Sequence, residues 1–248
     1  MTAYRLNRAL DRDALAAEFR RSGRVHIADF LDPASAADLH AFLKASSDWR
    51  LVLNQTDKVF DLDRAAQAAL SAEARAQLHE AVHAAARYGF QFMFESIRVP
   101  DDEPARAAQD DALNRFATFL SSDPVLAFFR QVTGKDAIAF ADAQATAYGP
   151  GHFLTAHDDE IAGKDRHAAY VFGLNPAWSP DWGGLLLFHR ADGHVAEAYV
   201  PRFNALNLFA VPQAHSVSLV APFAASRRYS VTGWLRGRAA ESHPAQGS

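Results

Sequence analysis

The sequence predicts an α+β protein with a mainly β core, a jelly roll buttressed by N-terminal helices. Two hydrophobic patterns predict this fold: helical spacing over residues 10–132, and short β-patterned runs from residue 137 onward. A third observation is the composition of the 248 residues, of which 49% are hydrophobic and 22% charged. Such a chain can bury a large core and is not disordered.

A single domain is expected over 1–248, because neither an internal repeat nor a linker divides the chain. Its parts would be a helix-rich N-terminal buttress (1–135), the β core (136–237) and a loose tail (238–248). The tail is rich in Pro, Gly, Ser and Gln, which is typical of terminal segments without fixed structure.

In the N-terminal half, apolar residues such as Leu15 and Phe19 recur at helical spacing. Asp32 followed by Pro33 predicts a helix start, because Asp caps a helix and Pro fits its first turn. The other elements expected here are a strand over 24–31, a strand region over 49–60, an alanine-rich helix over 65–89, and a helix or pair of helices over 110–133.

In the C-terminal half, short apolar runs alternate with turn clusters, which favours a sandwich or barrel. The runs are 138–148, 167–174, 185–189, 205–209 and 229–235, and the turn clusters are 149–151, 191–193 and 201–204.

The composition excludes several classes of function. The net charge is −4 and there is no basic block, so neither nucleic acid nor a membrane is expected as a partner. The absence of cysteine excludes disulfides, thiolate metal sites and a cysteine nucleophile. Without a secretory signal or an apolar span, a cytoplasmic protein is expected.

The densest group of chemically active residues is Thr155-Ala156-His157-Asp158-Asp159-Glu160. If this segment is extended, side chains alternate, and His157 and Asp159 share a face while Asp158 points away. With a second histidine they would form the two-histidine, one-carboxylate set that is diagnostic of non-haem Fe(II) oxygenases. Taken alone, a His-x-Asp sequence is more often a solvated acidic loop.

Two residues further along the chain strengthen the metal interpretation. His215 follows the run 205–209, and Arg228 opens the apolar run that ends near Trp234. A guanidinium buried there needs an anionic partner, and a dicarboxylate that chelates the metal at its other end would supply one. The alternatives are a hydrogen-bonded core histidine and an ordinary surface ion pair.

The order of these residues resembles the prolyl 4-hydroxylase-like branch of the Fe(II)- and 2-oxoglutarate-dependent oxygenases. The resemblance covers about ninety residues, a little over a third of the chain. It runs through Tyr148, His157-Asp158-Asp159, Arg166, Leu174-Asn175, Trp182-Gly183-Gly184-Leu185, Pro201-Arg202-Phe203-Asn204, His215 and Arg228-Tyr229-Ser230-Val231-Thr232-Gly233-Trp234.

The resemblance implies a double-stranded β-helix and an enzyme that uses Fe(II), 2-oxoglutarate and O₂, with ascorbate as an admissible reductant. It places iron on His157, Asp159 and His215, and the distal carboxylate of 2-oxoglutarate on Arg228. Tyr148 and Thr232 would be further 2-oxoglutarate contacts, although core packing explains Thr232 equally well.

The candidate substrate contacts are Arg166, Gln144 and Trp234. Gln144 shares an alternating face with Thr146 and Tyr148, so all three are placed to point into the barrel. The implied substrate is a prolyl residue in a peptide or protein. A free amino acid or small metabolite is the alternative substrate, and a non-catalytic β-barrel binding module is the alternative of another class.

Two features are less well determined. Some relatives carry a tyrosine late in the third core strand, where this chain has Gly173, so the hydroxyl contact to 2-oxoglutarate must come from elsewhere or be missing. The aromatic stretch over 88–95 could shape the cavity entrance, but core packing is expected because apolar stripes usually pack. His152, His167, His189 and His194 are expected to be structural or exposed.

Overall fold

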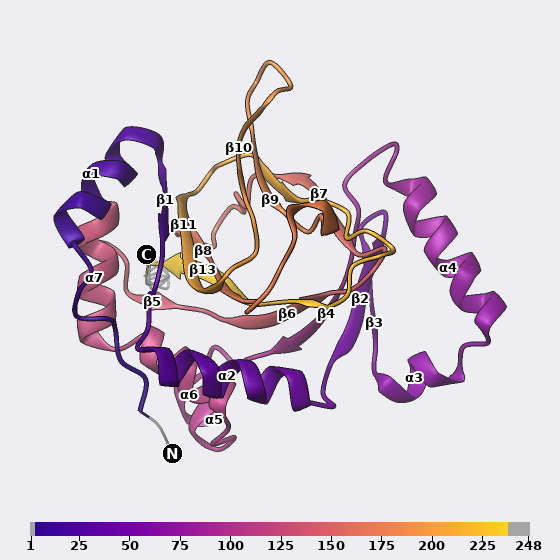
Figure 1. Ribbon diagram of the computed structural model, residues 1–248, viewed down its shortest axis with the longest axis horizontal. Coiled ribbons are helices and arrows are strands. Elements are labelled where there is room, and N and C mark those ends of the chain that lie inside the picture. Colours follow the sequence, from indigo (N-terminus) through magenta and orange to yellow (C-terminus); the bar gives the residue numbers. More distant parts are fainter. Residues whose placement is uncertain (1–2, 238–248) are drawn as a thin grey trace, which may run out of the picture.

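Within residues 3–237, which the computed structural model describes, thirteen strands form one antiparallel sheet that curls into a nearly closed barrel (Figure 1). The tail expected over 238–248 lies outside the described residues. The strands are, in chain order, β1 (Arg24–Ile27), β2 (Arg50–Gln55), β3 (Lys58–Leu62), β4 (Phe92–Arg98), β5 (Phe140–Ala141), β6 (Gln144–Tyr148), β7 (Phe153–His157), β8 (Arg166–Leu174), β9 (Leu186–His189), β10 (Val195–Tyr199), β11 (Phe203–Ala210), β12 (His215–Val217) and β13 (Arg228–Arg236).

The strand order is β1-β11-β8-β13-β6-β4-β7-β12-β9-β10, with β3 and β5 pairing outside this path and β2 joining β3 to β4. The sheet curves back on itself, and its inner face encloses a cavity. The architecture is the double-stranded β-helix, or jelly roll, that the sequence predicts.

Most of the helices lie against the outside of the barrel, as the N-terminal texture predicts (Figure 1). The helices are α1 (Arg12–Ser22), α2 (Pro33–Ala45), α3 (Arg64–Ala69), α4 (Ala72–Ala85), α5 (Glu103–Ala107), α6 (Ala112–Leu120) and α7 (Asp123–Thr133), with a 3-10 turn η1 (Pro180–Trp182). Asp32 caps α2 through its side chain and Pro33 occupies the first turn, as predicted.

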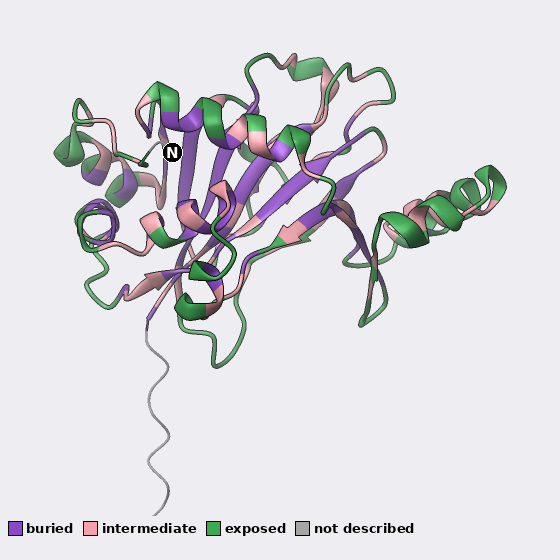
Figure 2. Cartoon of the chain, turned by 90° about the horizontal axis from the view of Figure 1, so that it is seen from below, coloured by how far each residue is buried: buried purple, intermediate pink, exposed green. Residues whose placement is uncertain are grey.

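The main core lies between these helices and one face of the sheet. Phe116 and Phe128 from the helices meet Phe30 and Phe172, and all four rings are fully buried. Burial of each phenylalanine contributes about 1.5–3 kcal/mol relative to exposure, so this cluster fixes the sheet against its buttress. Figure 2 shows the buried strands beneath the helices, in contrast to the largely exposed α4.

The N-terminal half also contributes four strands to the sheet, and one of them was not anticipated. β4 lies inside the sheet between β6 and β7, and β1 pairs with β11. The expectation that residues 88–95 simply pack in the core missed this strand. The rings at positions 90, 92 and 94 follow the two-residue period of a strand, and the pairing of this segment with β6 and β7 identifies it as one.

Two expected elements have different bounds. The helix expected over 65–89 is two helices, because Leu70 is extended and Ser71 caps α4 by accepting from the backbone of Ala74. The turn expected over 201–204 is shorter, since β11 begins at Phe203. Among the described residues, no helix is long and apolar enough to cross a bilayer.

Candidate metal centre

A cavity of about 390 Å³ opens inside the barrel, and every candidate site residue from the sequence lines it. They are His157, Asp159, His215, Arg228, Tyr148, Thr232, Arg166, Gln144 and Trp234. These side chains come from β6, β7, β8, β12, β13 and the loop after β7, so residues spread over about ninety positions converge on one space.

His157, Asp159 and His215 form a compact group at one end of this cavity. Nε2 of His157 lies 3.4 Å from Oδ1 of Asp159, and Nε2 of His215 lies 3.5 Å from Oδ2. His157 closes β7 and His215 opens β12, where the two residues are cross-strand partners. Their possible ligand atoms all lie within 4.8 Å of one another, close enough to share one metal ion.

The backbone conformation that brings Asp159 into this group differs from the extended one expected. β7 ends at His157, and Asp159 has a left-handed backbone with φ of 67°. The simple alternation of an extended strand therefore does not place its carboxylate. A turn does, since Asp tolerates this conformation better than most residues. Asp158 is exposed, and its carboxylate accepts from the backbone N–H of Glu160.

The hydrogen bonds of the two histidines leave the metal-facing nitrogens free. Nδ1 of His157 lies 3.0 Å from the carbonyl oxygen of Thr155, and Nδ1 of His215 lies 2.7 Å from that of Gln213. A carbonyl only accepts, so each neutral ring carries its proton on Nδ1 and keeps a lone pair on Nε2. Backbone contacts of this kind orient histidine ligands in metal proteins.

The charges of the group also suit a cation. Burial and the neighbouring His157 lower the pKa of His215 to about 4, so this ring is neutral near pH 7. Burial alone would raise the pKa of Asp159, but the hydrogen bond and charge of the histidines outweigh it and lower that pKa. The same contact works in the other direction, because burial alone would lower the pKa of His157 but the hydrogen bond and charge of Asp159 outweigh burial and raise that pKa. Neutral imidazole and ionised carboxylate are the forms that bind a divalent metal, so a bound cation would replace the proton of His157, and this donor set fits Fe(II).

Arg166 and Trp234 lie directly beside the metal group. The guanidinium of Arg166 is 3.5 Å from the ring centroid of Trp234, and its Nη1 donates to the backbone carbonyl of Asp159 at 2.9 Å. These contacts hold the turn that carries Asp159. Both residues also face the cavity, where a substrate would meet them.

Arg228 lies toward the other end of the cavity and is only 3% exposed. Its guanidinium lies 5.0 Å from the ring centroid of Tyr148, its cross-strand partner, and Nη1 is 3.4 Å from Oγ of Ser230. Among residues 3–237, no carboxylate lies within ion-pair distance of Arg228, and its Nε has no hydrogen-bond partner. A buried cation without a partner is costly, so this end of the cavity fits an anionic ligand.

Hydroxyl groups surround this arginine. Burial raises the pKa of Tyr148 to about 12, so its hydroxyl keeps its proton and can donate. Thr146 and Ser230 share a buried hydrogen bond of 2.8 Å beside Arg228. Ser230 was not among the sequence candidates, although its position two residues after Arg228 on the same strand face could have identified it.

Gly173 explains the missing tyrosine of the third core strand. It pairs with Ser230 on β13 and with Ala205 on β11, and a Cβ at Gly173 would overlap the carbonyl oxygen of Arg202. A tyrosine therefore cannot occupy this position without moving β11. In place of a tyrosine hydroxyl, the hydroxyls of Ser230 and Thr146 lie beside Arg228.

An aromatic wall completes the cavity, and it corrects the expectation of simple core packing for 88–95. Phe90, Phe92 and Phe94 alternate along β4 and its approach and all line the cavity. Phe94 stacks on Tyr148 with ring centroids 5.2 Å apart, whereas Phe90, at 50% exposure, lies 5.6 Å from the ring of His157. Two-residue periodicity separates these rings from buried Met93, which belongs to a core cluster.

The remaining histidines of the β half lie outside this cavity. His189 is within hydrogen-bond distance of the hydroxyl of Ser216, at 2.8 Å, and His152 is buried behind the Gly-Pro-Gly turn. His167 and His194 likewise do not line the cavity.

Comparison with known proteins points to the same class of oxygenase. Residues 143–236 match the family model of the 2OG-Fe(II) oxygenase superfamily. The chain is 30% identical over 141 residues to the prolyl 3-hydroxylase OGFOD1 of Mus musculus. That alignment covers 52% of this chain but only 25% of the mouse protein, so the chain spans about a quarter of the curated relative that it matches.

Solved structures share the fold. A Pseudomonas putida prolyl-4-hydroxylase superposes with a TM-score of 0.57 at 20% identity, covering 92% of this chain and 99% of that one. A Trichoplax adhaerens prolyl hydroxylase, solved with a peptide fragment of the hypoxia inducible factor oxygen degradation domain, gives 0.59 at 16% identity, with 91% and 89% covered. Residues 143–236, which include all the candidate site residues, therefore match the 2OG-Fe(II) oxygenase superfamily, and the chain shares its fold with solved prolyl hydroxylases.

Proposed function

We propose that the protein is an Fe(II)- and 2-oxoglutarate-dependent dioxygenase that hydroxylates an unactivated C–H bond, with a prolyl residue of a peptide or protein as its substrate. The observation that carries the proposal is the pairing of two sites in one cavity. A metal-binding group lies at one end, and a buried, unpaired guanidinium lies toward the other. A dicarboxylate that chelates the metal through its keto acid would meet both.

In this proposal His157, Asp159 and His215 hold Fe(II), and Arg228 binds the distal carboxylate of 2-oxoglutarate. When bound, the metal, the co-substrate and O₂ supply the oxidising chemistry that yields succinate, CO₂ and a hydroxylated product, with ascorbate as a reductant that keeps the iron ferrous. The protein orients the ligands and excludes water.

Two of the hydroxyl-bearing residues that line the cavity, Tyr148 and Thr232, have different expected roles. The protonated Tyr148 hydroxyl donates to the 2-oxoglutarate carboxylate beside Arg228, and its ring packs under the guanidinium. Thr232 is the cross-strand partner of Gln144, nearer the metal end of β13. Its hydroxyl would therefore contact the co-substrate closer to its middle.

The cavity mouth favours a substrate group that is compact and apolar. Phe90 and Ile161 line the mouth and are about half exposed. Arg166, with its guanidinium stacked on Trp234, adds a donor for a backbone carbonyl of the substrate, and Gln144 adds an amide. A prolyl ring flanked by peptide carbonyls has this combination, and the mouse relative is itself a prolyl 3-hydroxylase.

The decisive experiment is a mass-spectrometric screen with the Fe(II)-loaded protein, 2-oxoglutarate and two sets of substrates, proline-containing peptides and free amino acids. We expect the mass gain of one oxygen atom on the peptides, together with succinate formation. Oxidation of only the free amino acids would support the oxygenase reaction but would show that the substrate is a small metabolite and not a peptide. No 2-oxoglutarate turnover with any substrate would identify a non-catalytic binding module.

A further inference from the structure

A second cavity of about 380 Å³ lies on the opposite side of β4 from the metal centre. Helices α3 and α4 cover it from outside, and β2, β4 and the turn before β7 form its base. Its lining is Leu51, Arg64, Gln67, Ala68, Leu70, Arg75, Leu78, His79, Glu95, His152 and Arg227. None of these residues lines the metal-centre cavity, so the second cavity is a separate site.

Positive charge predominates in this second cavity. Three arginines, Arg64, Arg75 and Arg227, face one carboxylate, Glu95. Glu95 is 2% exposed and pairs with Arg64, at 2.6 Å, and with Arg227. One carboxylate cannot neutralise three guanidinium groups, so the lining has an excess of two positive charges.

Arg75 carries most of that excess. Arg75 is exposed, and its only side-chain hydrogen bond within residues 3–237 is from Nη2 to the backbone carbonyl of Gln67, at 3.2 Å, with no described carboxylate within 4.0 Å. The guanidinium therefore has further donors that no described side chain uses.

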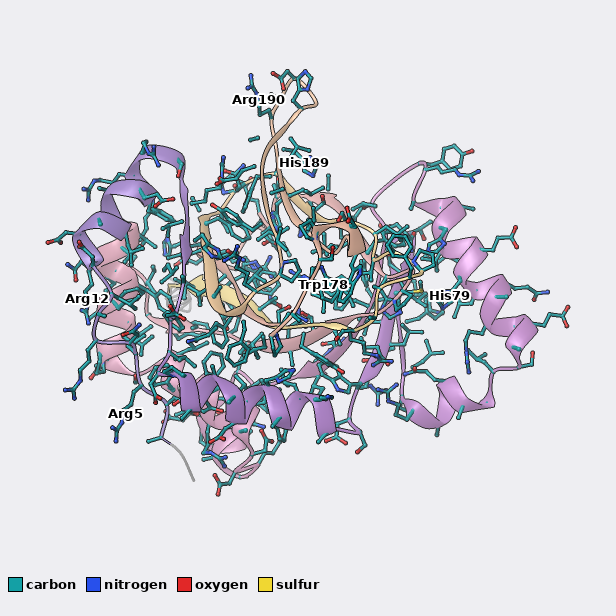
Figure 3. The ribbon with its side chains drawn as sticks, viewed as in Figure 1. Arg5, Arg12, His79, Trp178, His189 and Arg190 are labelled. Carbon is teal, nitrogen blue, oxygen red and sulfur yellow. The ribbon has the colours of Figure 1, made fainter. Side chains whose placement is uncertain are left out.

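Two histidines add donors without adding charge. Nδ1 of His152 accepts from the backbone N–H of Gly149 at 3.2 Å, so the neutral ring carries its proton on Nε2. His152 is only 8% exposed and lines the cavity, and its ring also contacts the backbone of Ala147. His79 extends from α4 toward the sheet (Figure 3), and its ring centroid lies 6.4 Å from that of His152.

We propose that this second cavity binds a small, multiply charged oxyanion, such as a phosphate or a polycarboxylate. Arg75 and Arg227 supply the charge, and the neutral ring of His152 supplies a further polar contact. The excess positive charge of the arginines would repel a metal cation. An apolar ligand would complement neither the excess positive charge nor the polar ring of His152.

The test is isothermal titration calorimetry of the full chain in chloride buffer, with inorganic phosphate in one arm and tricarballylate, a tricarboxylate, in the other. We expect saturable binding of at least one probe, and the stronger probe distinguishes a phosphate ligand from a carboxylate ligand. Arg75→Gln should weaken that probe about ten-fold or more, the value of a charged hydrogen bond. Thermal melting confirms that this variant folds.

Two controls locate the site. Arg20→Gln makes the same charge change at the exposed end of α1 and should leave the probe's affinity unchanged. Arg228→Gln removes the anion-binding residue of the metal-centre cavity, so the binding that remains in this variant is the binding assigned to the second cavity. In NMR spectra, the probe should shift amides of residues 64–79 and 95.

Three results would overturn the proposal: no saturable heat with either probe, equal losses in Arg75→Gln and Arg20→Gln, or loss of binding in Arg228→Gln. Because the measurement needs neither iron nor turnover, it is independent of the proposed oxygenase activity.

Discussion

Arg227 and Arg228 are consecutive residues whose side chains line cavities on opposite faces of the same sheet. Arg227 pairs with Glu95 in the second cavity, whereas Arg228 lies over Tyr148 in the metal-centre cavity. The alternation of side chains at the start of β13 produces this division. It also provides matched pairs of variants, in which neighbouring residues of the same type test different sites.

The first prediction concerns 2-oxoglutarate. Arg228→Ala should weaken its binding by roughly ten-fold to over a hundred-fold, because a charge-assisted contact is worth about 1.5–3 kcal/mol. Iron affinity should stay nearly unchanged, since Arg228 is not part of the metal group. Anaerobic titrations with Fe(II) and then with 2-oxoglutarate measure both. A larger loss in Arg227→Ala than in Arg228→Ala would contradict the assignment.

The second prediction concerns the metal. Asp159→Ala should reduce Fe(II) affinity strongly, because it removes the anionic member of the group and leaves two neutral imidazoles. Asp158→Ala should change it little, since that carboxylate is exposed and bonded to its own turn. Anaerobic Fe(II) titration of the two variants compares them directly. Equal losses would show that the carboxylate of Asp159 is not the ligand.

The third prediction concerns Gly173. Gly173→Ala should lower the free energy of unfolding by about 1–3 kcal/mol, because the added Cβ overlaps the carbonyl of Arg202 and separates β8 from β11. Gly89→Ala is the matched control, since a Cβ there meets nothing within 4 Å. Urea denaturation of both variants tests the difference. Equal losses of unfolding free energy in the two variants would mean that β11 shifts to make room for the Cβ, and that the steric overlap does not explain the glycine at position 173.

The fourth prediction concerns pH. Burial and the neighbouring His79 lower the pKa of His152 to about 4, below the 6.5 of the unfolded chain. The unfolded state therefore binds more protons between these values. The stability that neutral His152 provides is present above pH 6.5 and is lost as pH falls toward 4. Over that window the loss is roughly 3 kcal/mol.

His152→Gln should flatten that pH dependence, because glutamine does not titrate. Unfolding free energies at several pH values between 4 and 7, in anion-poor buffer, compare the variant with the wild type. A variant whose stability falls as steeply as that of the wild type would show that other groups cause the acid sensitivity.

Much of the candidate site could be predicted because local sequence determines it. The donor types and their order, from His157 through Asp159 and His215 to Arg228, can be found without a structure, since chemistry restricts which side chains bind a divalent metal or a carboxylate. The alternation of Gln144, Thr146 and Tyr148 likewise follows from the period of a strand, and all three line the cavity.

Other features could not be predicted because they depend on contacts between distant segments. Residues 88–95 become a cavity wall only because β4 inserts between β6 and β7. The two-residue period of Phe90, Phe92 and Phe94 indicates a strand, but it does not show that one face of that strand borders a cavity. Asp159 reaches the histidines through a left-handed turn, and a single backbone angle of this kind has no clear signature in an acidic loop.

Composition, spacing and side-chain chemistry were enough to predict the α+β class, several of the barrel strands and the residues able to bind a metal and an anion. Which of these residues share a cavity follows from the packing of distant segments. Glu95 and Phe94 are neighbours in the chain, yet one faces three arginines beneath α3 and α4 while the other stacks on Tyr148. The physical reason is that a strand has two faces, and what covers each face is set by elements far away in the sequence.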